Sequence, residues 1–330
     1  MKHQSLKTNL RYLKKPYDKR GFMFSTINAW FLRVYRFNQQ MFPFFPNVII
    51  FIVQFSLSYF TLLKFLQISL DTSTITKDVI TGSISLVLFV YLFRCFDEVK
   101  DYEDDKINFP TRPLVTGVVS IQDMYILQLV ILTVLIILNL IVPHGEDLKM
   151  GFFIVFIFTI LASRWFFAKR WIKPSLPLAL LTHNPVIYLH QIYIMSFFVL
   201  SKETLLSMAG LFLLSVALPG TAWEISRKIR GHREEDTYTT YSKIWGPHIP
   251  LVLISSLLTL SLVSSFIAYK DQVAAWALIL WLVPAFVLLK FIYQCFMFWK
   301  NTAKAPDFRK TVEAFVFAKI LILTVAYFLS

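Results

Sequence analysis

Long apolar runs separated by short polar connections fill the chain from Phe45 onward. The runs are continuous rather than alternating, which favours helices over the strands of a membrane barrel. Each run has about 17 to 25 residues, the length that crosses the hydrocarbon core of a bilayer as a helix. The pattern predicts nine spans, at 47–69, 79–96, 122–142, 150–168, 177–200, 205–223, 249–269, 273–293 and 311–329.

The segment before these runs, residues 1–44, is polar and basic, and the pattern separates it from a membrane domain at 45–330. Within this segment, residues 27–41 place five large apolar side chains at helical spacing. We expect a helix that lies in the cytoplasmic interface before the first span. An extension of the first span is the alternative, and Pro43 and Pro46 argue against it. The apolar positions are Ile27, Trp30, Phe31, Val34 and Phe37.

The composition supports a membrane protein and excludes a soluble domain. Of the 330 residues, 56% are hydrophobic and only 16% are charged, and the mean hydropathy is +0.60. The two cysteines, Cys95 and Cys295, predict neither a disulfide framework nor a metal cluster. Together with the apolar runs, these values predict an all-α, polytopic membrane protein.

Lysine and arginine gather in alternate connections. The N-terminal segment and the even-numbered connections hold 26 of them, whereas the odd-numbered connections hold four. The positive-inside rule therefore predicts that the N-terminus and the even connections are cytoplasmic. The net charge of +13 then reflects topology and contact with membrane lipid rather than nucleic acid. We expect a multi-pass protein of a bacterial inner membrane; an organelle membrane is the alternative, because the chain begins with a basic, acid-poor segment.

A stripe of aspartates follows the second span, in FDEVKDYEDDKINFPTRPL. Asp97, Asp101 and Asp105 are spaced four apart and share one helical face, which Asp104 joins. Like charges at this spacing repel one another, so the stripe predicts a divalent cation, and Mg²⁺ prefers such oxygen ligands. Arg112 follows on a proline-bounded turn and could reach phosphate oxygens. A solvated acidic loop is the alternative.

Two further polar segments fall in even-numbered connections. Residues 224–246 mix acids with bases, which suits a polyanion bridged by metal; a basic loop with partnered acids is the alternative. In WFFAKR, Lys169 and Arg170 either hold phosphate or anchor the helix end by snorkelling. The acids of the longer segment are Glu224, Glu234, Glu235 and Asp236, and its bases include Arg227, Lys228, Arg230 and Arg233.

The fifth span carries polar residues at membrane depth, among them His183, Asn184 and His190. Polar groups at this depth are expensive and usually face an internal cavity. They could contact a second substrate, and they could equally form hydrogen bonds between helices.

The first acidic segment resembles the first aspartate-rich motif of the UbiA superfamily of intramembrane prenyltransferases, Asn-x-x-x-Asp-x-x-x-Asp followed by Pro-x-Arg-Pro. The matching positions are Asp97, Asp101, Asp105, Pro110, Arg112 and Pro113, with aspartate at the first position in place of asparagine. Trp165, Lys169 and Arg170 look like the family's Tyr-x-x-x-Lys element, with tryptophan in place of tyrosine. The second aspartate-rich motif is replaced by Glu224, Lys228 and the cluster 234–236. The resemblance covers about residues 27 to 329.

This resemblance implies nine helices around a central cavity and a prenyltransferase, an enzyme that transfers alkyl groups other than methyl. The reaction would move a prenyl group from an isoprenoid diphosphate to an acceptor that the sequence does not identify, with Mg²⁺ as cofactor and release of pyrophosphate. The aspartates at 97, 101 and 105 would be the catalytic and metal-binding residues. Further metal ligands would be Glu224, Glu235 and Asp236, and the substrate-binding residues would be Arg112, Lys169, Arg170, Arg227, Lys228, His183 and Asn184.

Two other functions remain open at this stage. The altered second motif is also compatible with a transporter or lipid-binding membrane protein of the same fold that performs no catalysis. A CDP-alcohol phosphotransferase also uses membrane aspartates spaced by four, but it should carry Asp-Gly-x-x-Ala-Arg before them, and this sequence does not.

Overall fold

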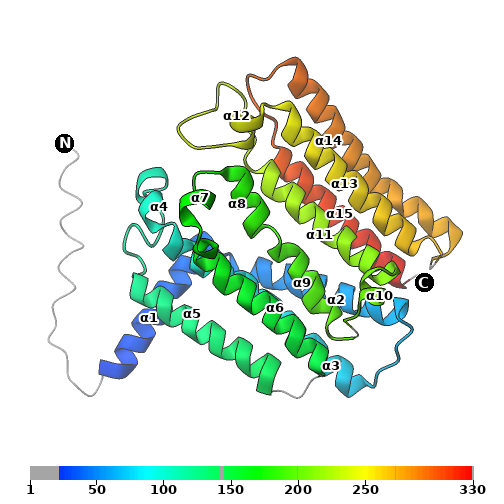
Figure 1. The fold of residues 1–330 in the computed structure, drawn as a ribbon, viewed down its shortest axis with the longest axis horizontal. Helices are drawn as coiled ribbons and strands as arrows, with labels where there is room; N and C mark the ends of the chain where they lie inside the picture. The colour runs from blue at the N-terminus through cyan, green and yellow to red at the C-terminus, as the bar shows by residue number, and fades with distance from the viewer. Residues whose placement is uncertain (1–21, 142–144, 199, 272, 329–330) are drawn as a thin grey trace, which may run out of the picture.

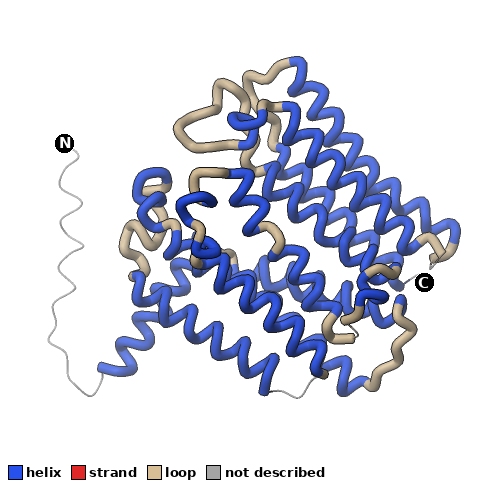
Figure 2. The backbone as a smooth tube through the Cα atoms, viewed as in Figure 1, coloured by secondary structure: helices blue, strands red, loops and turns tan. Residues whose placement is uncertain are grey.

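The computed structural model describes residues 22–141, 145–198, 200–271 and 273–328. These residues form helices and loops, and none of them lies in a strand (Figures 1 and 2). The first half of the chain contains α1 (Phe22–Met41), α2 (Phe44–Phe65), α3 (Thr72–Lys100), α4 (Tyr102–Asn108), α5 (Ile121–Ile136), a π-helical turn (Ile137–Ile141) and α6 (Glu146–Ser163).

The second half begins with four short helices, α7 (Lys169–Ile172), α8 (Leu176–His183), α9 (Val186–Met195) and α10 (Lys202–Leu205). The remaining helices are α11 (Met208–Ser226), α12 (Tyr241–Trp245), α13 (His248–Tyr269), a 3₁₀ segment (Ala275–Trp281), α14 (Leu282–Lys300) and α15 (Phe308–Phe328). Helices α11, α13, α14 and α15 lie side by side, and α8 and α9 lie between them and α6 (Figure 1).

Within the part of the chain that the structure describes, six helical segments are long and apolar enough to cross a membrane. They correspond to the first, second, third, sixth, seventh and eighth predicted spans, which establishes an integral membrane protein. The fourth and ninth predicted spans correspond to α6 and α15, and the fifth is divided between α8 and α9 at Asn184 and Pro185. The proline cannot continue the hydrogen-bond ladder of α8, so the interruption follows from the sequence. The count of nine stays a prediction.

Helix α1 is anchored to the bundle by one side. Arg33 donates two hydrogen bonds to Asp123 near the start of α5, at 2.8 and 2.7 Å. Ser120 and Asp123 also form a capping box that satisfies the first amides of α5. On α1, Phe37 is fully buried against this region, whereas Phe31 and Tyr35 are exposed. A predicted helix at 27–41 is therefore present; its position in the membrane interface stays a prediction.

The even-numbered connections meet at one end of the bundle. Lys173 pairs with Asp104 at 2.8 Å, and the rings of Phe109 and Tyr238 lie 6.0 Å apart. The amide of His232 donates to the carbonyl of Thr302, which joins the sixth and eighth connections. Odd-numbered connections meet elsewhere, where the amide of Leu200 donates to Asp147. We call the first of these the motif end, because the predicted site residues outside the fifth span lie there.

A buried lysine links three helices of the second half. Lys319 of α15 is only 4% exposed, and its ammonium donates to the carbonyl oxygen of Ser215 on α11 and, at 2.7 Å, to the hydroxyl of Ser261 on α13. Buried charge is tolerated only where such acceptors satisfy it. This residue therefore fixes the register of α15 against its neighbours.

Candidate functional site

The aspartate stripe lies on a nearly continuous helical path. The amide of Asp101 donates to the carbonyl of Asp97, and the amide of Asp105 donates to that of Asp101, both at 2.9 Å. Asp101 lies at the junction of α3 and α4, where its backbone (φ −98°, ψ 3°) departs from helical geometry although the i to i−4 hydrogen bonds continue through it. The three carboxylates therefore follow one another at single-turn spacing, as predicted.

Asp101 differs from its neighbours because its carboxylate makes no hydrogen bond or ion pair with any residue that the structure describes. Asp97 instead pairs with Lys100 at 2.6 Å, and Asp105 accepts from Arg112. Burial raises the pKa of the Asp101 carboxyl to about 6, and the negative charge of Asp97 adds to the rise. A cation bound here would stabilise the charged form, so Asp101 is the residue of the stripe whose environment most clearly favours a cation.

A buried ion network supports the stripe from behind. Glu98 is only 1% exposed; it accepts from Arg94, and one of its oxygens lies 3.9 Å from the guanidinium of Arg112. Arg112 also donates to Asp105, which joins the network to the stripe. Burial raises the pKa of Asp105, although the Arg112 guanidinium opposes that rise. Arg94 and Glu98 belong to none of the sequence motifs; their one-turn spacing and opposite charge are the signals that would have indicated the pair.

Aromatic side chains pack beneath Asp97. The ammonium of Lys100 lies 4.4 Å from the centre of the Trp165 ring, and that ring contacts His183 at 5.2 Å between centroids. Phe93, one turn before Asp97 on α3, contacts the other side of this cluster through His183 at 6.4 Å. His183 therefore lies close to the stripe, as the hypothesis of substrate contact requires, although it also contacts neighbouring helices.

The segment after α6 has an unusual backbone. The φ angles of Trp165, Phe166 and Phe167 are 53°, 50° and 57°. They lie in the left-handed region, which residues other than glycine usually avoid. Each such residue costs roughly 1–2 kcal/mol. Lys169 and Arg170 follow this turn and are exposed, and the Arg170 guanidinium lies over Trp171.

The sixth connection begins with paired charges at the end of α11. Glu224 accepts from Arg227 through both oxygens, at 2.6 and 3.0 Å, and lies 3.2 Å from the ammonium of Lys228. One turn earlier, Thr221 accepts from Asn184 at 2.6 Å and contacts the hydroxyl of Tyr188 at 2.9 Å. Asn184 is thus engaged between helices, which was the alternative given for the polar residues of the fifth span.

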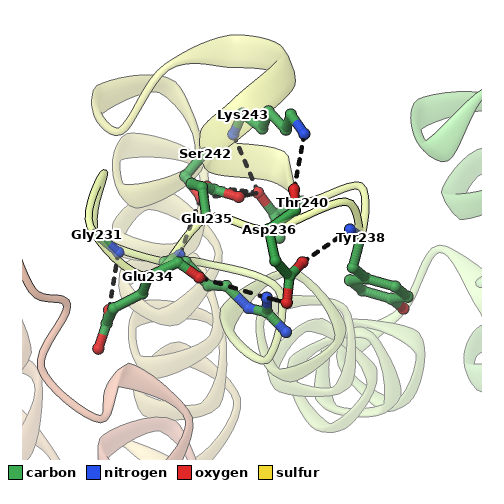
Figure 3. A network of polar contacts seen from close by, with 9 residues as sticks. Gly231, Glu234, Glu235, Asp236, Tyr238, Thr240, Ser242 and Lys243 are labelled. Carbon is green, nitrogen blue, oxygen red and sulfur yellow. Dashed lines mark hydrogen bonds and ion pairs between the residues drawn. The ribbon is translucent and has the colours of Figure 1, made fainter. Parts of the chain in front are cut away.

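The other acids of this connection hold the loop together (Figure 3). Glu234 accepts from the amides of Gly231 and Ala305, both at 2.9 Å. Glu235 accepts from the hydroxyls of Thr240 and Ser242, each at 2.7 Å. These two carboxylates satisfy donors of the loop itself and of the eighth connection.

Asp236 has the same kind of role. It accepts from Arg230 at 2.6 Å and from the amide of Tyr238 at 2.7 Å (Figure 3). The hydrogen bond from Arg230 lowers the pKa of Asp236, and the amides of Ala305 and Gly231 lower that of Glu234. Metal binding by Glu235 and Asp236 stays a prediction, and it would require these contacts to change.

The donor set of the stripe fits Mg²⁺ by its chemistry. Its ligands would be carboxylate oxygens only, which this ion prefers, and Asp101 has an unpaired carboxylate. Within the described ranges, no three His, Cys, Asp or Glu side chains converge as a ready metal cage.

No protein-family model and no curated protein matches this sequence. Two solved structures share the fold. One belongs to work on digeranylgeranylglyceryl phosphate synthase in membranes; it is 18% identical, with a TM-score of 0.55 over 92% of this chain and 97% of that one. The other is an apo UbiA homologue from Aeropyrum pernix K1, 15% identical, with a TM-score of 0.58 over 84% and 97%. The resemblance inferred from the aspartate motif is thus confirmed at the level of the fold.

Proposed function

We propose that this chain, which has the fold of UbiA homologues, transfers a prenyl group from an isoprenoid diphosphate to an acceptor within the membrane. The observation that carries this proposal is Asp101, an unpaired, half-buried carboxylate between two other aspartates at the end of a membrane helix. Such a group favours a cation, and Mg²⁺ in turn favours a diphosphate.

The donor's diphosphate would bind at the motif end. Asp97, Asp101 and Asp105 would hold Mg²⁺, which supplies positive charge against the leaving pyrophosphate. Arg112 and Lys228 would donate hydrogen bonds to phosphate oxygens. Contact between Phe109 and Tyr238, 6.0 Å apart, supports a role for both connections at one substrate. Roles for Lys169, Arg170 and Arg227 in binding phosphate belong to the same proposal.

The bond between the allylic carbon and the diphosphate oxygen would break with both electrons leaving on pyrophosphate. The acceptor's nucleophile would then bond to that carbon and release its proton. Aromatic faces stabilise a neighbouring positive charge, and Phe93 and Trp165 lie directly below Asp97 and Lys100. Their packing around His183 would also exclude water from the allylic cation.

Binding of an unreactive geranylgeranyl thiodiphosphate tests the donor site. Purified protein in nanodiscs should bind this analogue with Mg²⁺ and lose it with EDTA. Incubation with labelled geranylgeranyl diphosphate and candidate acceptors then tests transfer. Binding that is independent of Mg²⁺, or that is unaffected by replacing Asp101 and Asp105, would contradict the proposal.

A second function is favoured by the loop contacts of Glu234, Glu235 and Asp236. Because these acids already serve the fold, they favour a protein that binds a diphosphate lipid without turning it over and that needs no second metal site. The two functions differ in one result: the non-catalytic protein binds the analogue but releases no pyrophosphate from the true donor with any acceptor.

A further inference from the structure

A pocket of about 290 Å³ lies at the motif end, between the end of α3, the start of α5 and the turn that follows α6. Its walls are of two kinds. Phe96, Val99 and Trp165 are apolar or aromatic, whereas Lys100, Arg164 and Lys169 are basic. None of the residues that line it is acidic. The pocket therefore offers positive charge beside an apolar surface at the edge of the membrane domain.

Two of its three cations have no counter-ion. Neither Arg164 nor Lys169 makes an ion pair with any residue in the described ranges, and both side chains are exposed. Lys100 is different, because its side chain is only 7% exposed and pairs with Asp97. The indole N–H of Trp165 is buried and also lacks an acceptor. These donors leave unused capacity for an anion.

A second, larger groove has no comparable set of unpaired cations. It has a volume of about 460 Å³ and is lined by Arg227, Arg230 and Arg309. Each of these arginines already pairs with a carboxylate, at 2.6, 2.6 and 2.7 Å. The smaller pocket thus has the greater excess of unpaired positive charge.

The backbone of the turn strengthens this distinction. Three consecutive aromatic residues, at 165–167, adopt left-handed φ angles between α6 and the exposed Lys169. Such strain persists only where surrounding structure enforces it, and it gathers at binding and active sites. Here it reverses the chain so that Arg164, Trp165 and Lys169 line one pocket.

We propose that this pocket binds the anionic head group of an amphiphile whose tail lies in the bilayer. The chemistry is that of a phosphate ester: Arg164, Lys169 and Lys100 would meet the negative oxygens, and Phe96 and Val99 the first carbons of the tail. Two sources share this chemistry, a bulk anionic phospholipid and a free phosphate ester. The pocket shares Lys169 with the proposed donor site, but it uses none of the three aspartates as ligands. Arg164 has no part in the donor site, so the test is placed on that residue.

Native mass spectrometry of the full chain tests this site. Phosphatidylglycerol and phosphatidylcholine are titrated into protein in neutral detergent, and glycerol phosphate is added as a soluble competitor. Wild type should retain phosphatidylglycerol in preference to phosphatidylcholine. Arg164→Gln should lower that affinity about tenfold, since a charge-assisted hydrogen bond is lost, and Arg164→Lys should restore most of it.

The matched control is Lys310→Gln, which removes a basic residue from the same end of the bundle. Lys310 is 79% exposed and already pairs with Asp307 at 2.9 Å, so retention of lipid should not change. Arg164→Gln should also keep Mg²⁺-dependent binding of the thiodiphosphate analogue, which separates this pocket from the donor site.

Competition by glycerol phosphate decides between the two sources. Displacement of phosphatidylglycerol at millimolar glycerol phosphate identifies a free phosphate ester as a sufficient ligand. If glycerol phosphate displaces no phosphatidylglycerol, the ligand is the lipid. The proposal is overturned if the two lipids bind equally or if Arg164→Gln and the control Lys310→Gln lose lipid to the same extent. It is also overturned if Arg164→Gln abolishes binding of the thiodiphosphate analogue as the aspartate variants do.

Discussion

Two acidic segments lie at the motif end, and their carboxylates have different surroundings. In the sixth connection, Glu234 and Asp236 each accept hydrogen bonds from loop amides or an arginine, and their pKa values are lowered. In the stripe, Asp101 has no such partner and its pKa is raised to about 6. Acids that stabilise the fold have donors already in place, whereas Asp101 keeps its carboxylate oxygens available to a ligand.

The largest effect should come from removing the unpaired acid, Asp101, together with its neighbour Asp105. The double variant Asp101→Asn, Asp105→Asn should weaken Mg²⁺-dependent binding of the thiodiphosphate analogue at least about 100-fold, because each lost charge-assisted contact is worth roughly 1.5–3 kcal/mol. Isothermal titration calorimetry in nanodiscs measures this loss. Glu103→Gln is the matched control, since its side chain is 77% exposed and pairs only with Lys106. An equal loss in the control would show that the stripe acts only through its overall charge.

A loop acid should affect stability rather than binding. Glu234→Ala leaves the amides of Gly231 and Ala305 without their acceptor, which costs about 1–3 kcal/mol if both become buried and unpaired. The thermal unfolding midpoint in detergent should fall by several degrees, while the folded fraction keeps its affinity for the analogue. Asp271→Ala, at a side chain that is 80% exposed, should leave the midpoint unchanged. A loss of Mg²⁺-dependent binding without a loss of stability would place Glu234 with the stripe instead.

The pH dependence separates the two segments further. Because the folded pKa of Asp101 is raised to about 6, the native protein holds a proton there that the unfolded chain has released between about pH 4 and 6. Stability from this group therefore falls as pH rises through that window. Mg²⁺ competes with the same proton, so its affinity should rise about fivefold from pH 5 to 6 and about tenfold from pH 5 to 7, and should level off above that.

Glu234 and Asp236 have lowered pKa values, so they ionise at a lower pH than Asp101 and should contribute little to the change in Mg²⁺ affinity above pH 5. Titrations of Mg²⁺ at several pH values, in wild type and Asp101→Asn, measure the difference. A slope that persists in the variant would assign the titrating proton to another group.

The smallest effect is expected at an exposed pair that joins the second and fourth connections. Lys173 and Asp104 are 40% and 42% exposed, and ion pairs of this kind contribute less than about 1 kcal/mol. Lys173→Gln should therefore change analogue affinity less than about threefold, and 0.5 M salt should remove even that difference. A loss comparable to that of the aspartate variants would mean that Lys173 contacts the ligand.

The sequence was sufficient to predict the helical membrane domain and the aspartate stripe, because both depend on local periodicity. A run of apolar residues has few alternatives to a helix in lipid, and a four-residue spacing shares one face wherever the helix lies. The interruption at Pro185 was also visible, since proline breaks the hydrogen-bond ladder. The helical membrane domain could therefore be predicted without knowledge of any long-range contact.

The partners and burial of individual acidic side chains could not be predicted in the same way. Glu98 and Glu103 look alike in the sequence, yet Glu98 is 1% exposed beside two arginines and the side chain of Glu103 is 77% exposed. Glu234 finds one of its donors, Ala305, 71 residues away. Only tertiary contacts decide which acid is neutralised by the protein and which is left for a ligand, and no local pattern encodes them.

Lys319 has a consequence for how the protein enters the membrane. A helix with a lysine near its middle is released poorly into lipid on its own, since the charge has no partner there. Its acceptors, Ser215 and Ser261, belong to α11 and α13, which leave the ribosome earlier. We expect α15 to be held at the translocon until these helices are present. A chain truncated before α15 would then insert normally, whereas α15 fused to an unrelated carrier would be translocated across the membrane instead of being inserted into it.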